Sequence, residues 1–307
     1  MATFGQTALQ NGIHAAIVSA ARQNDVHIEI NEFASTQELN GFQKFIFEHY
    51  EFTPPELPFE VKSIIIAAAP HPSYGEAVFA YSGSEYRLYC VAGSEDTTTH
   101  DYVTETITST GFNIKPTGFW FPFKRFAVQS GLCVYGRNNV TYLPGFGSYM
   151  ALSAYYTDMP ADEDTWRSVV TAPQCENCGI CEKLCPTGAI KSGEFVIDST
   201  LCLAGMNEGP EEFPPFVPRN AHHTLFDCMR CQYSCPMNGP FKANTYPTVF
   251  FDETETERLL SGAPYDDLEG ELAEKYKQLS MQYTGNLPRN LRVCFDLIDS
   301  GEELSLC

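Results

Sequence analysis

The front of the chain alternates apolar segments with polar breaks, as mixed helical and stranded domains do. Residues 8–24 carry apolar positions at helical spacing and predict an amphipathic helix. The alternation at residues 26–30 predicts a short strand, and residues 36–50 predict a second helix with Thr36 as its N-cap. The apolar run at residues 61–69 is short and rich in isoleucine, which predicts a buried strand.

The same pattern continues through the rest of the chain. Residues 88–92 predict another strand, and residues 97–111 a helix that ends at a Gly111 cap. Residues 250–285 have a helical pattern and are strongly acidic. The aromatic segment Phe119, Trp120, Phe121 and Phe123 is expected in the core or in the wall of an apolar pocket.

Cysteine spacing adds the chemistry. Eight of the twelve cysteines lie in three groups between residues 175 and 235. The first group has the spacing C-x2-C-x2-C-x3-C-P of bacterial two-cluster ferredoxins, the third has C-x2-C-x3-C-P, and one cysteine stands between them. A tight loop of this kind surrounds one cubane with three thiolates, so the fourth ligand must come from a distant residue. The sequence therefore predicts two [4Fe–4S] clusters.

The ligands can be divided between the clusters because, in two-cluster ferredoxins, the fourth cysteine of the run binds the other cluster. The first cluster is then expected to take Cys175, Cys178, Cys181 and Cys235, and the second Cys185, Cys202, Cys228 and Cys231. Structural zinc is the alternative for paired cysteines, but its sites do not use four cysteines at this spacing. Disulfides would require an oxidising compartment.

The expected fold class is α+β. An α/β front domain at residues 1–165 precedes a bacterial-ferredoxin-like two-[4Fe–4S] domain at 166–247 and an acidic C-terminal helical segment at 248–307. Cys90, Cys133, Cys294 and Cys307 have no partners at ligand spacing and are expected to be free or buried thiols. The pair His222-His223 is expected in a solvated loop, although hydrogen bonding to a cluster is the alternative.

Charge and targeting signals limit the partners. The net charge is −20 and is spread over both halves of the chain, so a nucleic-acid backbone is a disfavoured partner. No apolar run is long enough to span a bilayer, and the N-terminal residues lack the pattern of a secretory signal. Unpaired thiols favour a reducing, cytoplasmic location.

The residues together resemble a known family, the epoxyqueuosine reductases, and more distantly the reductive dehalogenases. The resemblance covers residues 60–295 and rests on the eight cysteines and on five segments: Gln129-Ser130-Gly131-Leu132, Tyr135-Gly136-Arg137-Asn138-Asn139, Gly147-Ser148, Tyr156-Thr157-Asp158 and Leu287-Pro288-Arg289-Asn290-Leu291.

This resemblance implies a cobalamin cofactor whose cobalt the clusters reduce. The residues that it places around a corrinoid are Ser130, Gly131, Tyr135, Asn138, Gly147 and Ser148, with the loop of residues 202–209. The chain departs from the family at two acidic positions, one of them the proton donor, where it has Thr117 and Phe123. Neither side chain is a useful acid near neutral pH, so the catalytic residue is unknown. Candidates for a replacement donor are Tyr81, Tyr86, Tyr135 and Asp158.

Three functions remain open. The first is a corrinoid-dependent oxidoreductase that takes electrons from a ferredoxin or flavodoxin and reduces a small-molecule substrate other than tRNA. The second is an electron-transfer protein, or a reductive activator of a partner redox protein. The third is tRNA epoxyqueuosine reduction itself, which the altered acidic positions and the net charge of −20 disfavour.

Overall fold

A computed structural model describes residues 12–71, 74–90, 98–241, 245–279, 281 and 285–306. The chain divides into two compact units, each made of two stretches of sequence. Unit 1 comprises residues 1–70 and 96–176, and unit 2 comprises residues 71–95 and 177–307. The expected domain limits at residues 165 and 247 differ from this packing division and stay a prediction.

Unit 1 contains a four-stranded antiparallel sheet in the order β1-β2-β8-β5. The central strand β2 is the predicted buried strand, and its residues 63–69 are all buried. Because side chains alternate between the faces of a strand, Ile64 and Ile66 enter one core while Ile65 and Ala67 enter another. The strands are β1 (His14–Ser19), β2 (Ser63–Pro70), β5 (Ile114–Pro116) and β8 (Met150–Thr157).

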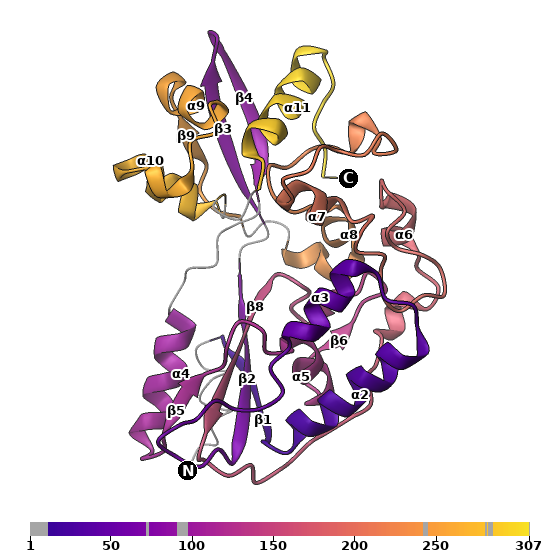
Figure 1. Ribbon diagram of the computed structural model, residues 1–307, viewed down its shortest axis with the longest axis vertical. Coiled ribbons are helices and arrows are strands. Elements are labelled where there is room, and N and C mark those ends of the chain that lie inside the picture. Colours follow the sequence, from indigo (N-terminus) through magenta and orange to yellow (C-terminus); the bar gives the residue numbers. More distant parts are fainter. Residues whose placement is uncertain are drawn as a thin grey trace. The chain divides into compact units, whose positions relative to one another are not determined.

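Helices cover both faces of this sheet, as Figure 1 shows. Helices α2 (Arg22–Thr36) and α5 (Phe123–Gln129) pack on the face that carries Ile64 and Ile66, and α4 (Thr98–Ser109) packs on the other face. Helix α3 (Gly41–His49) begins at an Asn40 capping box. Its predicted start at Thr36 was therefore wrong, because Thr36 ends α2.

Two predictions near the N-terminus fail. Residues 14–19 of the expected helix form β1, and the part of that prediction before residue 12 lies outside the described residues. The expected strand at residues 26–30 belongs to α2, which buries Val26 and Ile30 one turn apart and leaves Ile28 48% exposed. Phe119, expected to be buried, is 82% exposed, whereas Phe121 is in the core.

Unit 2 contains a three-stranded sheet in the order β4-β3-β9. Strands β3 (Gly75–Tyr81) and β4 (Ser84–Cys90) form a hairpin whose two turn residues, Ser82 and Gly83, have φ angles of 50° and 75°. Positive φ at both positions matches the right-handed twist of the flanking strands. Strand β9 (Val249–Phe251) pairs parallel to β3 from a distant part of the sequence.

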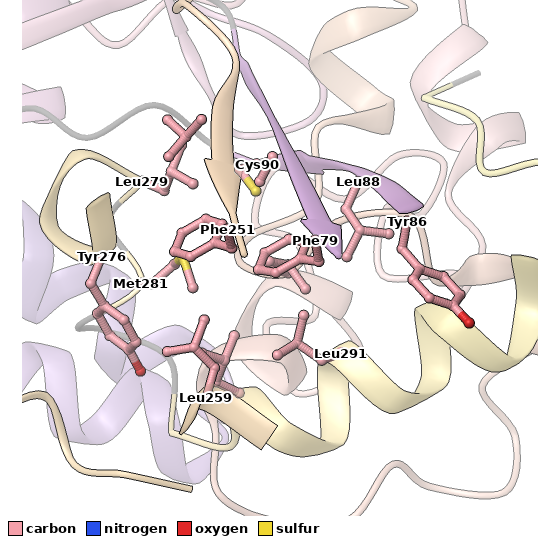
Figure 2. Packing of buried hydrophobic residues seen from close by; sticks show 14 of the residues in the cluster. Phe79, Tyr86, Leu88, Cys90, Phe251, Leu259, Tyr276, Leu279, Met281 and Leu291 are labelled. Carbon is pink, nitrogen blue, oxygen red and sulfur yellow. The ribbon is translucent and has the colours of Figure 1, made fainter. Parts of the chain in front are cut away.

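The core of unit 2 lies between this sheet and three helices. Figure 2 shows Phe79 of β3 facing Phe251 of β9, with ring centroids 4.6 Å apart, and Leu259 and Leu291 beside them. These helices are α9 (Glu253–Leu260), α10 (Gly270–Gln278) and α11 (Leu287–Asp299). The α+β fold class is confirmed, and none of the described helices is both long and apolar enough to cross a membrane.

The cysteine-rich region is built from short helical turns joined by loops. They are η1 (Pro173–Cys175), α6 (Ile180–Leu184), α7 (Leu203–Glu208), η2 (Arg219–Ala221), α8 (Arg230–Tyr233) and η3 (Pro236–Phe241). A further turn, η4 (Tyr265–Asp267), lies between α9 and α10. In unit 1, the small sheet of β6 (Val134–Tyr135) and β7 (Thr141–Tyr142) precedes this region in sequence.

Candidate metal centre

The first cysteine group combines two helical turns with a sharp bend. Cys175 ends η1, whose first residue is Pro173, and α6 carries Cys181 one residue after its start. Gly179 precedes α6 with a φ of 68°, a conformation that favours glycine. The cysteine loop can therefore reverse direction between Cys178 and Cys181.

The third group repeats this arrangement. Cys231 lies in α8, one residue after its start, as Cys181 does in α6. Each helix is followed by a cysteine and a proline, Cys185-Pro186 and Cys235-Pro236. Helices α6 and α8 pack against each other in unit 2. The two halves of the region therefore have the internal symmetry expected of a two-cluster ferredoxin.

Cys202 lies among the thiols expected at the second cluster. Its thiol interacts electrostatically with Cys185, and Cys228 interacts with Cys202. Burial raises the pKa of Cys202, against backbone N–H groups of Ala204 and Gly205 that hydrogen-bond to its sulfur. Such N–H donors stabilise a thiolate, which is the form that binds iron. The assignment of ligands to each cluster stays a prediction, and the proximity of these three thiols agrees with it.

Exposure separates the candidate ligands from the other cysteines. All eight candidates are half-buried, whereas Cys90, Cys133 and Cys294 are buried, and none of these eleven forms a disulfide. Cys307 lies outside the described residues. Within the described part of the chain, no three side chains gather as a site for a single ion. A cubane instead spaces four thiolates over a larger cage, so the eight half-buried thiols fit iron–sulfur clusters.

Two adjacent side chains of α11 hold the segments that carry Cys202 and Cys228. Asn290 Nδ2 donates to the carbonyl oxygens of Asn207 (2.9 Å) and Leu225 (2.8 Å), and Arg289 Nη2 donates to that of Met206 (2.7 Å). Asn207 Nδ2 donates in turn to the carbonyl of Asp227 (2.7 Å). We call these contacts the α11 clamp. It fixes the spacing between the end of α7 and the residues just before Cys228.

The chain just before α11 also lies close to the backbone that follows α7. The Gly285 amide donates to the carbonyl of Glu208 at 2.7 Å, and a side chain at Gly285 would collide with the backbone of residues 208–210. In the sequence, residues 287–291 stand out only through the resemblance to the epoxyqueuosine reductases. No sequence pattern indicated that Asn207 would join it.

His222 and His223 contradict the expectation of a solvated loop. Their exposed fractions are 7% and 0%, because His222 packs against Phe213 and His223 Nδ1 lies 2.7 Å from the carbonyl of Ala221. Burial, followed by nearby arginine charge at His222, lowers the pKa of His222 to about 4, and burial lowers that of His223 to about 4. Both rings are therefore neutral near pH 7.

Known proteins resemble both this region and the fold as a whole. Residues 174–238 match the family described as "4Fe-4S double cluster binding domain". The epoxyqueuosine reductase of Listeria monocytogenes is 30% identical over 112 residues, which is 36% of this chain and 28% of that protein. That of Lactococcus garvieae is 24% identical over 59% of this chain and 50% of that protein.

Solved structures show the likeness over the full fold. A selenomethionine-labelled epoxyqueuosine reductase aligns with a TM-score of 0.65 and 20% identity, covering 94% of this chain and 79% of that one. Another, solved with an epoxyqueuosine-modified tRNA stem loop, aligns with a TM-score of 0.66 and 19% identity over the same shares. The chain is similar to the epoxyqueuosine reductases.

The epoxyqueuosine reductase-like chain has a double-cluster domain, and its cofactors include two [4Fe–4S] clusters. The chain matches these relatives over about a quarter to a half of their own length. The match alone therefore does not assign their activity to this chain. When bound, such clusters take up and release single electrons.

The six residues that the resemblance places around a corrinoid all lie in unit 1. Ser130 caps α5 and its hydroxyl donates to the carbonyl of Ala127, and Asn138 Nδ2 donates to the Tyr142 hydroxyl. Tyr135 and Ser148 are buried. Four of the six side chains, those of Ser130, Tyr135, Asn138 and Ser148, are therefore packed within the unit. Gly131 and Gly147 have φ angles of 81° and 79° and offer backbone rather than side chains.

A fit of this segment to a corrinoid therefore rests on main-chain groups. Beside Ser130, the Gln129 side chain is 1% exposed and its Oε1 has no hydrogen-bond partner within the described residues. A side chain added at Gly131 would meet the Arg167 guanidinium at 2.9 Å. Because that guanidinium ends a flexible side chain, it is the φ of 81° that favours glycine at position 131.

The candidate proton donors have structural partners in the epoxyqueuosine reductase-like fold. Asp158 accepts hydrogen bonds from the main chain and side chain of Asn113, both at 2.7 Å. Although burial alone would raise the pKa of Asp158, these hydrogen bonds lower it. The Tyr86 hydroxyl donates to Asp299, and burial raises the pKa of Tyr86 and of Tyr135. Tyr81 packs against the core of unit 2.

Proposed function

We propose that the chain is an iron–sulfur oxidoreductase that passes electrons through its two [4Fe–4S] clusters to a bound corrinoid, which reduces a substrate other than tRNA. The observation that carries the proposal is the set of eight half-buried thiols, seven of them in two symmetric turns, within an epoxyqueuosine reductase-like fold. A ferredoxin or flavodoxin would supply the electrons.

The corrinoid part of the proposal rests on the resemblance at residues 129–148 and on the glycine backbone there. When bound, a corrinoid would supply a cobalt centre that the clusters can reduce. The residues that would hold it are Gly131 and Gly147 through their main chain. The buried side chains of Ser130, Tyr135, Asn138 and Ser148 would support this backbone.

The substrate part rests on what replaces the family's acids. Thr117 follows β5 and donates its amide to the carbonyl of Ala154, and Phe123 begins α5 and packs against a core of unit 1. Neither position supplies a proton donor. With a net charge of −20, the chain also repels a phosphate backbone. A small-molecule substrate that needs no acid at these positions fits both facts.

The lost acids also favour a second candidate, an electron-transfer protein or reductive activator that binds a partner redox protein. Such a protein keeps the clusters and needs no proton donor. The third candidate, tRNA epoxyqueuosine reduction, is favoured by the relative solved with a tRNA stem loop. A reducing compartment such as the cytoplasm would suit all three.

Anoxic cobalamin binding tests the proposal. The purified protein is mixed with cobalamin and desalted, and its absorbance spectrum is recorded. We expect about one corrinoid retained per chain with a shifted band. Gly131→Ala should retain much less, because it adds a side chain at a positive φ to the backbone proposed to hold the corrinoid and displaces the Arg167 guanidinium beside it.

The matched control is Gly301→Ala, which has a φ of 82° and no atom within 4 Å of the added carbon. It should retain corrinoid as the wild type does. Full cluster content without any corrinoid retention would favour the electron-transfer protein instead. A salt-sensitive gel shift with epoxyqueuosine-modified tRNA would favour the third candidate.

A further inference from the structure

Arg137 lies where the small sheet of unit 1 meets the chain that leads to the first cysteine. Strand β6 pairs with β7 on one side, and on the other Tyr135 exchanges hydrogen bonds with residues 170–172: its amide donates to Val170 (3.0 Å) and its carbonyl accepts from Ala172 (2.7 Å). Cys175 follows directly, and its amide donates to the carbonyl of Ala172 at 2.9 Å. The position of Cys175 is therefore tied to β6.

A tight turn then directs Arg137 toward Cys175. The Gly136 amide donates to Val140 and its carbonyl accepts from Asn139, which has a φ of 58°. A side chain at Gly136 would collide with the Tyr142 ring and with Asn138 Oδ1. Position 136 therefore has to be glycine, and the residue after it is held against the cysteine segment.

Three contacts join Arg137 to this segment. Its amide lies 3.4 Å from Cys175 Sγ and donates to it. Its guanidinium Nη2 donates to the carbonyl of Cys175 at 2.6 Å and to that of Glu176 at 3.3 Å. All three residues belong to unit 1. Arg137 thus places its positive charge and its main-chain N–H group beside Cys175, one of the eight candidate ligands.

We propose that Arg137 is a positioning residue that sets the reduction potential of the first cluster: its guanidinium holds the Cys175–Glu176 backbone and its charge stabilises the reduced cluster. This inference rests on the proposed function, in that Cys175 must be a cluster ligand. It assigns to Arg137 a role toward iron and sulfur rather than toward a corrinoid.

The sign follows from the charges. A [4Fe–4S] cluster with four thiolates gains one negative charge when it accepts an electron, and its potential depends on net charge and on hydrogen bonds to the sulfurs. Because arginine stays protonated at every accessible pH, its charge favours the reduced state throughout. Removing the charge should therefore lower the potential, whereas removing a merely structural contact would lower cluster content without a directed shift.

The test is a redox titration of the anoxically purified full chain, followed by electron paramagnetic resonance. Arg137→Gln removes the charge but retains a donor amide, and Arg137→Lys retains the charge. We expect Arg137→Gln to shift one of the two one-electron transitions to lower potential and to leave the other in place, with about eight iron atoms per chain retained. Arg137→Lys should keep both transitions close to their wild-type potentials.

Lys115→Gln is the matched control, since it removes one positive charge from an exposed site on β5 in the same unit. It should move neither transition. An unshifted pair of transitions in Arg137→Gln would overturn the inference, as would an equal shift in the control. Cys175→Ala tests the ligand assignment separately from the role of Arg137: it should lose about half the iron, and full iron content would show that the ligand assignment itself is wrong.

Discussion

Two neighbouring histidines in unit 2 have a lowered pKa because they are buried. His222 and His223 are buried just before the third cysteine group, with Arg289 and Arg230 as the nearby charges. Their folded-state pKa of about 4 lies below the ordinary value of 6.5. Between these values the unfolded chain binds protons that the native chain does not. The contribution of the two neutral rings to the free energy of unfolding is therefore fully present above pH 6.5. It falls as the pH drops toward 4, by at most about 1.4 kcal/mol per pH unit for each ring.

We predict that His222→Phe weakens this dependence, because phenylalanine fills the site beside Phe213 without titrating. The melting temperature of the wild type should fall more steeply than that of the variant between pH 7 and pH 5, measured on anoxic protein. His27→Phe, at an exposed position on α2, should follow the wild type. Parallel curves for the wild type and His222→Phe would contradict the prediction. Comparing variants removes any acid lability that the clusters contribute equally.

Single residues also show where sequence reasoning stops. The cysteines were found from spacing alone, because an iron–sulfur cluster demands ligand types at fixed intervals. His222 and His223 were misplaced because nothing in their neighbours reveals that Phe213 and Ala221 would enclose them. Phe119 was misplaced for the converse reason: of the aromatic residues that follow it, Phe121 is buried in the core and Phe123 packs against it, whereas Phe119 itself is exposed.

At the scale of elements, the prediction of a strand succeeded where both faces are buried. The run at β2 is apolar at every position, so no other periodicity competes. In α2, Val26, Ile28 and Ile30 satisfy a strand pattern, and Val26 with Ile30 also satisfy a helical one. Because Ile28 is exposed, the burial pattern is that of a helix and not of a strand. That exposure depends on how α2 packs on the sheet, which cannot be read from the sequence.

The α11 clamp makes an element-scale prediction. Asn290→Ala leaves the carbonyls of Asn207 and Leu225 buried without their donor, which should cost about 1–3 kcal/mol for each unsatisfied group. Because the clamp spaces the segments of Cys202 and Cys228, we also expect iron to fall toward half. The measurements are the melting temperature and the iron-to-protein ratio.

An exposed position on the same helix provides the control for this prediction. Asp296→Ala should stay within about 0.5 kcal/mol of the wild type and keep all its iron. If Asn290→Ala lost stability but kept both clusters intact, the clamp would be a packing contact without influence on the second cluster.

At the scale of the whole molecule, each unit is assembled from two separated stretches of chain. The sequence predicted a front domain, a cluster domain and an acidic tail, because composition changes at those points. It did not predict that β3 and β4 would join the C-terminal part, since a parallel pairing between residues 77–79 and 249–251 leaves no local signal. Long-range pairing of this kind depends on the completed fold.

Adjacent residues of β9 test this organisation. Phe251→Ala should destabilise unit 2 by about 3–5 kcal/mol, because the ring is 2% exposed and stacks on Phe79. Phe250→Ala, at a ring that is 59% exposed, should change stability by about 0.5 kcal/mol or less. Denaturant unfolding followed by circular dichroism measures both, and equal losses would refute the pairing of β9 with β3.

The parallel partner of β3 has a consequence for biosynthesis. All eight candidate ligands are synthesised before β9 and α11, so at that stage the scaffold that spaces them still lacks a strand and its clamp. Unit 1, by contrast, has its whole sequence by residue 176. Iron and sulfide delivered before α11 is made would meet unconstrained thiols, and cluster loading should therefore follow the synthesis of α11.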